Sequence, residues 1–222
     1  MFPERIETER LALTPVGPDH VDLDTLYRIC SSDPDIEDVT RYVRWSPHET
    51  KRETREFLAN ARDQREAGEG ADYVIRPRAD ELRRGATSRT DEPDTGDIAG
   101  LCGLVCDWDR RSAELGMWLR KRFWGRGYSG ERAAALLAVA FEGLDLEIVA
   151  VDVHVDNEAS RRAVDRYISR FGGRREGVLR NRIRFFDGSV HDAVRYTVSR
   201  GEWRATIEDD PVSVRLDGEA VS

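Results

Sequence analysis

Lysine, paired cysteines and long apolar runs are all scarce in this chain. No apolar stretch approaches the roughly 18 residues that a membrane-spanning helix needs. The first residues, MFPERIETERLAL, carry charges where a secretion signal would have an apolar core. These absences predict a cytoplasmic protein with no membrane partner.

The cysteines are too few and too isolated to suggest a metal or redox site. There are three, Cys30, Cys102 and Cys106, and no histidine lies within ten residues of the Cys102–Cys106 pair. The pair lies in an apolar run, where the period of two in a strand places both thiols on one face. We therefore interpret these residues as buried strand cysteines and expect no metal site.

The scarcity of lysine leaves arginine as the main cation of a strongly charged surface. Lysine occurs only at Lys51 and Lys121, while carboxylates outnumber Lys and Arg 43 to 35 and give a formal charge of -8. An acidic surface with little lysine resembles that of proteins from salt-adapted, halophilic cells. It disfavours nucleic acid, which binds clustered cations, and it suits an amine substrate.

The length of 222 residues allows one substantial domain, which we place at residues 1–203. Residues 78–97 contain many turn formers and almost no apolar side chain, so they are expected to form a flexible loop within it. Residues 204–222 are acidic and show no apolar periodicity, which predicts a loose C-terminal tail.

Apolar periodicity divides the rest of the chain into alternating strands and helices. The predicted strands are 10–16, 71–77, 98–109, 112–120 and 147–155. The predicted helices are 20–30, capped by Asp19, then 48–68, 129–144 and 156–173. Strands at 175–186 and 189–200 flank Asp187-Gly188 and predict an antiparallel hairpin. Because the strand, helix and strand at 113–155 must form a parallel crossover, the expected fold class is a mixed α/β (α+β) sheet flanked by helices.

The stretch RFWGRGYSG, residues 122–130, enters a helix and contains the dinucleotide pattern G-x-G-x-x-G. Asp152 lies about twenty residues further on, where a ribose-binding acid is expected. Three features disfavour a dinucleotide site: RKRFW separates the preceding strand from the glycines, Asp152 lies in mid-strand, and the chain continues into an antiparallel hairpin. A P-loop is excluded because Gly-Lys-Ser and Gly-Lys-Thr do not occur.

Read as Arg122-x-x-Gly125-x-Gly127, the same loop resembles the R/Q-x-x-G-x-G/A loop of the GNAT superfamily of N-acetyltransferases. The resemblance extends from Ile6 to about Trp203 and is closest to the branch of ribosomal-protein N-terminal acetyltransferases. The segments that carry it, in chain order, are ETERLAL, AELGMWL, GRGYSGE, VDNEAS, RREGVLRN and DGSVHDAVRYTVS. It implies a mostly antiparallel, GNAT-like sheet with a central, splayed pair of parallel strands.

The resemblance also implies that acetyl-CoA is the co-substrate and that the glycine loop binds its pyrophosphate. Unpaired amides at the start of a helix suit such an anion, and glycine lets the backbone approach it closely. The candidate loop contacts are Arg122, Gly125, Arg126, Gly127, Tyr128, Ser129 and Gly130. The pantetheine arm is expected between the splayed strands, beside the backbone of Trp118 and Leu119 and close to Asn157 and Ser160. Asn157 is equally suited to cap a helix, and the two roles are compatible.

Acetyl transfer from a thioester to an amine needs a base, an oxyanion donor and an acid. Glu114 is the candidate base, because AELG matches a glutamate that faces the acceptor in this branch; a salt bridge with an arginine or a water chain is the alternative. An amide near Met117 is the candidate oxyanion donor. Many relatives carry an acidic tyrosine seven residues after the asparagine, but this chain has Val164 there. Ser160, Tyr167 or water remain for the acid, and Ser160 is favoured.

The acceptor site is expected near the segment TRYVRWSPHE, which matches the wall of that site in relatives. Tyr42 and Trp45 are therefore candidate acceptor contacts, together with Glu114. The predicted activity is direct transfer of acetyl to a primary amine, either a protein N-terminus or a small amine, in a ternary complex. A non-catalytic acyl-CoA sensor or interaction module is the alternative that Val164 suggests. Dimers are common in this branch, which makes a homodimer a candidate assembly.

Overall fold

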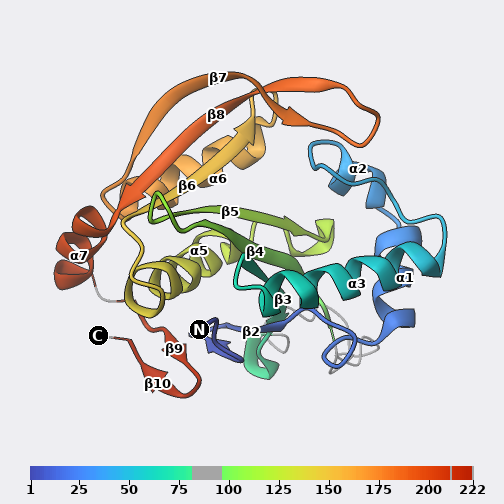
Figure 1. Cartoon of the computed structure of the whole chain (residues 1–222), viewed down its shortest axis with the longest axis horizontal. Coiled ribbons are helices and arrows are strands. Elements are labelled where there is room, and N and C mark those ends of the chain that lie inside the picture. The colour runs from blue at the N-terminus through green and yellow to red at the C-terminus, as the bar shows by residue number, and fades with distance from the viewer. Residues whose placement is uncertain (82–96, 211, 222) are drawn as a thin grey trace.

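The computed structural model describes residues 1–81, 97–210 and 212–221. Its strands form a ten-stranded sheet in the order β10-β9-β1-β2-β3-β4-β5-β6-β8-β7 (Figure 1). The strands are β1 (Ile6–Glu7), β2 (Leu11–Pro15), β3 (Gly70–Pro77), β4 (Gly100–Asp107), β5 (Ser112–Leu119), β6 (Ile148–His154), β7 (Arg174–Arg184), β8 (Val190–Ser199), β9 (Arg215–Leu216) and β10 (Glu219–Ala220). The helices are α1 (Leu23–Ser32), α2 (Ile36–Thr40), α3 (Lys51–Glu66), α5 (Tyr128–Ala138), α6 (Glu158–Arg170) and α7 (Arg200–Asp209).

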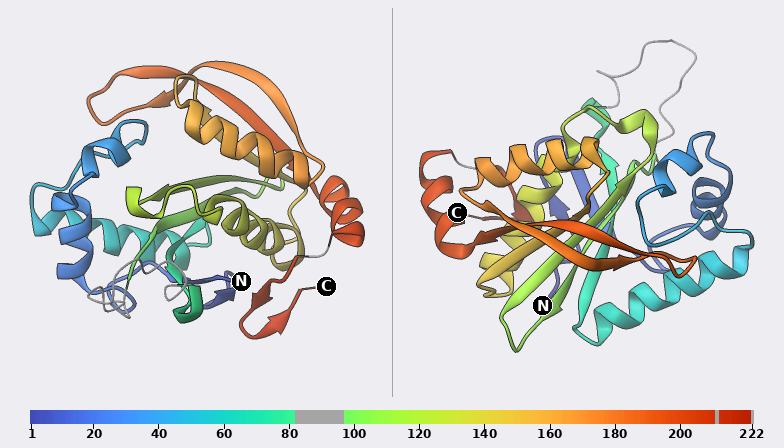
Figure 2. Two further views of the ribbon diagram at one scale, coloured as in Figure 1. Left: turned by 180° about the vertical axis from the view of Figure 1, so that it is seen from behind. Right: turned by 90° about the horizontal axis from the view of Figure 1, so that it is seen from above.

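Helices cover both faces of the sheet, because successive strand residues point to opposite sides. On β3, Tyr73 and Ile75 pack in the cluster that contains α5 and α6, whereas Val74 packs in the cluster that contains α1 and α3. Figure 2 shows these two groups of helices on opposite sides of the sheet. We call the two sides the α5 face and the α3 face.

The predicted parallel crossover is confirmed, and its two strands separate. β5 and β6 are parallel and pair only from Ser112↔Ile148 to Glu114↔Ala150. The other neighbouring strands of the described sheet pair in antiparallel fashion. Beyond Glu114 the facing edges of β5 and β6 are therefore unpaired within the described part of the chain, and we call this opening the β5–β6 gap.

Local capping moves several helix boundaries from their predicted positions. α1 begins after Asp22, not Asp19, because the Asp22 carboxylate accepts the N–H of Thr25 at 2.8 Å. The predicted cap of α6 at Asn157 is confirmed, since its side chain accepts the N–H of Ser160 at 3.1 Å. The two-residue strand β1 and the five-residue helix α2 are not predicted, since neither is long enough to show a period.

The prediction of a loose tail at 204–222 is wrong for the described residues. Most of α7 lies there, and its Trp203 is fully buried between Phe141 and Phe171. β9 then pairs with β1, and β10 pairs with β9. β9 and β10 are too short for periodicity to reveal, and they pair because β1 offers an unpaired edge.

Most of the predicted loop at 78–97 lies outside the described residues. Within the described part, no helix is long and apolar enough to cross a membrane. Cys30, Cys102 and Cys106 are free thiols, and burial raises the pKa of the Cys102 thiol to about 12.

Candidate active site

The glycine loop turns the chain from β5 into α5 with two left-handed residues. After a short 3₁₀ turn at Lys121–Phe123, Gly125 has a φ of 76° and Gly127 a φ of 80°. Only glycine adopts this conformation without strain. The conformation of the turn, in addition to any approach of a ligand, therefore requires glycine at both positions.

The loop presents a row of unpaired backbone donors. The N–H groups of residues 125–129 donate no hydrogen bond within the described part of the chain, and the next two, of Gly130 and Glu131, donate to the Gly127 carbonyl. Gly127 caps α5 without a side-chain bond, so the positive end of the helix dipole faces the same side. The arrangement is suited to an anion.

Arg10 holds this loop in place. Its Nε donates to Glu131 Oε2 at 2.7 Å and its Nη1 donates to the Arg126 carbonyl at 2.8 Å. Thr8 adds a bond to Glu131 Oε1 at 2.5 Å. The negative charge of Glu131, which would oppose an anion at the helix start, is thus neutralised. The sequence contains no signal for this role of Arg10, because 121 residues separate it from Glu131.

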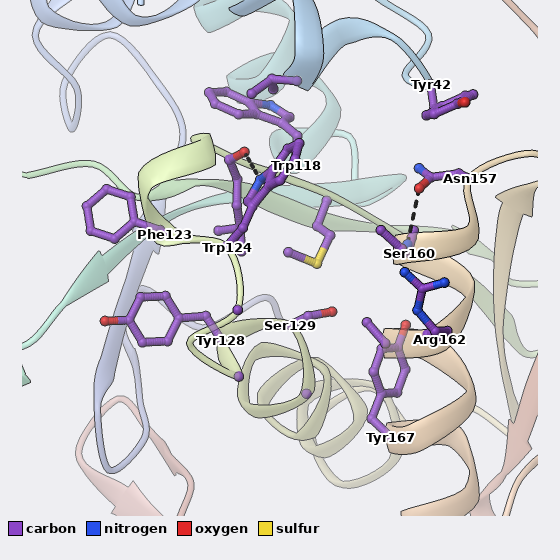
Figure 3. A pocket seen from close by; sticks show the side chains of 18 of the residues that line it. Tyr42, Trp118, Phe123, Trp124, Tyr128, Ser129, Asn157, Ser160, Arg162 and Tyr167 are labelled. Carbon is purple, nitrogen blue, oxygen red and sulfur yellow. Dashed lines mark hydrogen bonds between the residues drawn. The ribbon is translucent and has the colours of Figure 1, made fainter. Parts of the chain in front are cut away.

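A cavity of about 970 Å³ opens beside the loop and reaches β5, α6 and the end of α2 (Figure 3). Most of the predicted cofactor contacts line it. The predicted residues in its wall are Tyr42, Trp118, Leu119, Gly125, Gly127, Tyr128, Ser129, Gly130, Asn157 and Ser160. Segments that are far apart in the sequence therefore meet at this cavity.

The two predicted arginines of the loop do not line the cavity. Arg122 forms an ion pair with Asp97 and stacks on Phe123, and Arg126 also lies over the Phe123 ring. Other cations line the wall in their place: Arg41, Arg162, Arg166 and Arg170. Arg166 makes no ion pair or hydrogen bond among the described residues, so its charge is available to a ligand. The sequence shows how the arginines of α6 are spaced, but it does not show that their side chains point into the cavity.

The β5–β6 gap exposes backbone groups of alternate β5 residues. Arg120 donates its N–H to Ala99 beside β4 at 2.9 Å. Since antiparallel pairing alternates, the backbone of Trp118 faces β4, whereas that of Met117 and Leu119 faces the gap. The Leu119 carbonyl there accepts the indole N–H of Trp124 at 2.8 Å. Trp118 thus reaches the cavity with its side chain rather than with its backbone.

Two residues of α6 that carry a hydroxyl group, Ser160 and Tyr167, line the cavity. Val164, at the position where many relatives carry a tyrosine, has no hydroxyl group. Ser160 lines the wall one turn after the Asn157 cap, and Val164 is buried. Tyr167 also lines the wall, and its hydroxyl makes no hydrogen bond among the described residues. Burial raises the pKa of that hydroxyl, and the charge of Arg132 opposes the shift.

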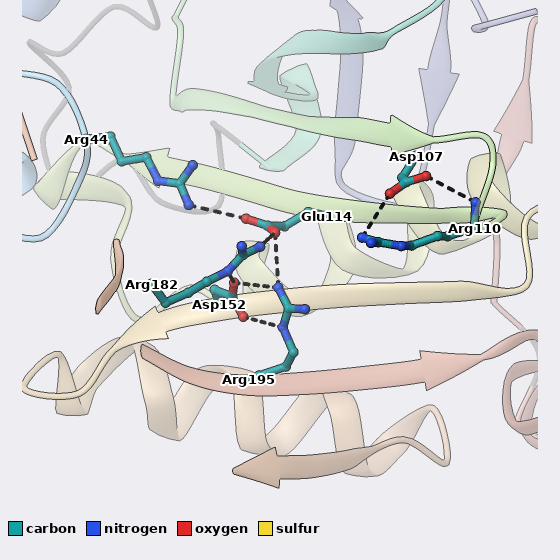
Figure 4. A network of polar contacts seen from close by, with 7 residues as sticks. All are labelled: Arg44, Asp107, Arg110, Glu114, Asp152, Arg182 and Arg195. Carbon is teal, nitrogen blue, oxygen red and sulfur yellow. Dashed lines mark hydrogen bonds and ion pairs between the residues drawn. The ribbon is translucent and has the colours of Figure 1, made fainter. Parts of the chain in front are cut away.

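Glu114 lies on the α3 face among arginines, not among apolar neighbours, and it does not line the cavity. Its carboxylate contacts Arg44 at 3.3 Å, Arg195 at 3.2 Å and Arg182 (Figure 4). Arg182 lies in a bulge of β7, where Asn181 has a φ of 52°. A bulge of this kind redirects a side chain, and here it brings Arg182 to Glu114.

Asp152 completes this network from β6. Its side chain is 2% exposed and accepts bonds from Arg195 at 2.7 Å and from Arg182 at 2.5 Å. Burial would raise the pKa of Asp152, but the hydrogen bonds of both guanidinium groups outweigh it and lower the pKa. The predicted alternative of a salt bridge at Glu114 is therefore present, as part of a network that joins Glu114 and Asp152 to three arginines.

The two predicted acceptor contacts separate in the structure. Tyr42 lines the cavity, and its ring centre lies 5.0 Å from that of His154. Trp45 does not line it and packs instead against Trp118, with ring centres 5.2 Å apart. Among the residues that the structure describes, no group of three or more His, Cys, Asp and Glu side chains is arranged to hold a metal ion.

Comparison with known proteins gives a family match over most of the chain. A family model described as Acetyltransferase (GNAT) domain matches residues 10–167. YdaF of Bacillus subtilis (strain 168), which bears the provisional name ribosomal N-acetyltransferase, is 36% identical over 107 residues. These residues are 46% of this chain and 56% of YdaF, so the chain matches little more than half the length of that relative.

Solved structures share the fold over nearly the whole chain. A crystal structure from T. thermophilus, provisionally described as an acetyltransferase, has a TM-score of 0.70 at 29% identity and covers 93% of this chain and 94% of its own. RimJ of Mycobacterium smegmatis, solved with CoA-disulfide, has a TM-score of 0.71 at 17% identity and covers 96% and 99%. The fold class expected from the sequence is confirmed.

Proposed function

This chain belongs to the acetyltransferase (GNAT) family, as its glycine loop suggested, and from this premise we propose that it transfers the acetyl group of acetyl-CoA to a primary amine. The observation that carries the proposal is the row of free N–H groups at residues 125–129 in the wall of the cavity. These groups suit the pyrophosphate of acetyl-CoA. Arg41 and Arg166, which line the same cavity, suit its remaining phosphate.

The β5–β6 gap supports direct transfer in a ternary complex. A pantetheine arm along the gap would bring the thioester carbonyl near the N–H of Met117, which can stabilise the oxyanion. Ser160 is our choice for the group that protonates the departing thiolate, and Tyr167 is the alternative. The amine would then approach from the α3 face, opposite the glycine loop.

For the acceptor, we propose the N-terminal amine of a protein. YdaF carries the provisional name ribosomal N-acetyltransferase, and this supports a ribosomal protein as the first candidate. A small amine is the second candidate to assay.

Gly127→Glu tests the assignment of the loop. The variant places a side chain at a φ of 80° and a carboxylate beside the free amides. Isothermal titration calorimetry should show acetyl-CoA binding weakened by about 100-fold or more, which corresponds to a loss of about 2.7 kcal/mol. Gly201→Glu is the matched control. Gly201 lies on α7, and a Cβ there would meet nothing within 4 Å, so this variant should bind acetyl-CoA normally.

Unchanged affinity in Gly127→Glu would show that the phosphates bind elsewhere. Free thiol released in the presence of an amine separates a transferase from an acyl-CoA sensor, because a sensor binds the cofactor without turnover. A wild-type protein that binds acetyl-CoA and acetylates no amine would contradict the proposed transfer.

A further inference from the structure

One carboxylate of the α3 face, that of Asp72, has no side-chain partner among the described residues. Asp72 lies in the middle of β3 and makes no hydrogen bond or ion pair through its side chain among the residues that the structure describes. It is half-buried, and neither of its oxygens is sealed from solvent. Glu114 and Asp152, on the same face, are both held by arginines. A shielded carboxylate without a cation is costly to the fold, so a ligand that supplies the cation would bind there favourably.

A row of glycines connects Asp72 to the β5–β6 gap. In the sheet register Asp72 pairs with Gly103 on β4, and Gly103 pairs with Gly116 on β5. Gly116 lies two residues beyond Glu114, where the pairing of β5 with β6 ends. The row therefore runs straight from the carboxylate to the edge at which the acetyl group is proposed to lie.

The two glycines keep this row clear in different ways. A methyl group on Gly103 would lie 2.0 Å from Asp72 Oδ1, so the carboxylate extends directly over β4 toward β5. A methyl group on Gly116 would meet nothing within 4 Å, so the space above it is open. Adjacent strands are about 4.8 Å apart, which leaves room for an amine, or an amine and one water, between Asp72 and the gap.

We propose that Asp72 binds the ammonium group of the acceptor and takes its proton before acetyl transfer. This inference rests on the proposed function. An N–H bond of the ammonium breaks and an O–H bond forms on Asp72, and the freed lone pair attacks the thioester carbonyl carbon. The C–N bond forms as the C–S bond breaks. The nitrogen then loses a second proton to solvent, and the departing thiolate gains one proton from Ser160, which is reprotonated by solvent. Asp72 then releases its proton to solvent.

The protonation behaviour of Asp72 agrees with this role. Burial raises the pKa of Asp72 to about 6, whereas an ordinary α-ammonium group has a pKa of about 8. A base with a pKa near the working pH is ionised when it is needed and still accepts a proton readily. In the adjacent cross-strand row on the same face, Gly70 pairs with Val105 and Val105 pairs with Glu114. The nearby arginines, such as Arg195, bind Glu114 rather than Asp72.

The test compares Asp72→Asn with Asp107→Asn, an exposed aspartate at the end of β4 that pairs with Arg110. The acceptors are hexapeptides that begin with Ala, Ser or Met, and spermidine, and the readout is thiol release from about pH 5 to about pH 9. For the most active acceptor, Asp72→Asn should lower kcat/KM by about 100-fold. It should also abolish the acidic limb near pH 6, with acetyl-CoA affinity unchanged. Asp107→Asn should match the wild type.

Gly116→Val provides a second, independent variant. Valine favours a strand and fills only the open space above β5, so the fold and the acetyl-CoA affinity should persist while kcat/KM falls at least about tenfold. An active wild type with an equally active Asp72→Asn variant and an unchanged pH profile would overturn the role of Asp72 alone. A wild type that binds acetyl-CoA but acetylates none of these amines would overturn the proposed function, and the role of Asp72 with it.

Discussion

Asp152 and Asp72 both lie within strands on the α3 face, yet their surroundings are opposite. Asp152 on β6 receives two guanidinium groups, from Arg195 and Arg182. Asp72 on β3 faces two glycines and receives none from the residues that the structure describes. One side of the face is thus closed by a charge network, and the other side keeps an open row with an unpaired carboxylate.

The difference shows that burial alone does not fix what a carboxylate does. Burial raises the pKa of Asp72 to about 6, while hydrogen bonds from arginine lower the pKa of Asp152 despite its burial. A carboxylate that is already neutralised stabilises the fold and is a poor proton acceptor. A carboxylate without a partner costs stability and remains free for a ligand.

Removing an arginine from the network should produce the largest change in stability. Arg195→Met leaves Asp152, which is 2% exposed, with a single cation. We expect the free energy of unfolding at about pH 7 to fall by about 3 kcal/mol, measured by urea denaturation. Arg110→Met removes the partner of the exposed Asp107 and should cost less than about 0.5 kcal/mol. Equal losses in the two variants would contradict the distinction between a buried and an exposed pair.

Asparagine at the two positions should change stability in opposite directions. Burial raises the pKa of Asp72 in the folded state. The ionised carboxylate therefore lowers the free energy of unfolding above about pH 6, and this loss disappears as the pH falls toward the pKa of Asp72 in the unfolded chain. Asp72→Asn should therefore stabilise the protein at about pH 8, by on the order of 2 kcal/mol, and not at about pH 4. For Asp152 the folded pKa is lowered, so the wild type has its advantage at neutral pH and loses it as the pH falls below about 4.

Urea denaturation at about pH 8 and about pH 4 measures the change for Asp72→Asn, and a further measurement at about pH 2 tests the loss predicted for Asp152. Destabilisation by Asp72→Asn at the higher pH would mean that Asp72 has a structural partner after all.

The smallest predicted change concerns the base chosen from the sequence. Glu114→Gln keeps the shape of a side chain that contacts three arginines. Its kcat/KM should fall by less than about fivefold, or about 1 kcal/mol, and the acidic limb of the pH profile should remain. If Glu114→Gln lost the acidic limb and its kcat/KM fell by more than about fiftyfold, Glu114 would be the base, and the contrast with Asp72 would be contradicted.

Local pattern was sufficient for the glycine loop and for most of the sheet. Gly125 and Gly127 form the turn into a helix that the motif indicated, and Asn157 caps α6. The alternation in residues 112–120 and the apolar run at 147–155 predicted the two strands, and the resemblance to the family implied that they separate. These features depend on neighbours within a few residues, so a single sequence contains them.

Side-chain direction and long-range partners were not predictable in this way. Arg122 turns to Asp97 and Arg126 to Phe123, while arginines of α6 reach the cavity. Glu114 belongs to the alternating strand as expected, but β7 and β8, more than sixty residues later, surround it with arginine. The C-terminal strands β9 and β10 likewise depend on a distant partner, because β9 pairs with the edge of β1.

The sequence by itself determined the glycine loop and most of the longer strands and helices, because these follow from local spacing, and the order of its motifs indicated the family. The tertiary structure alone decided which charges meet. It paired Asp152 and Glu114 with arginines and left Asp72 above a row of glycines, because cross-strand register, rather than position along the chain, sets the neighbours of a strand residue.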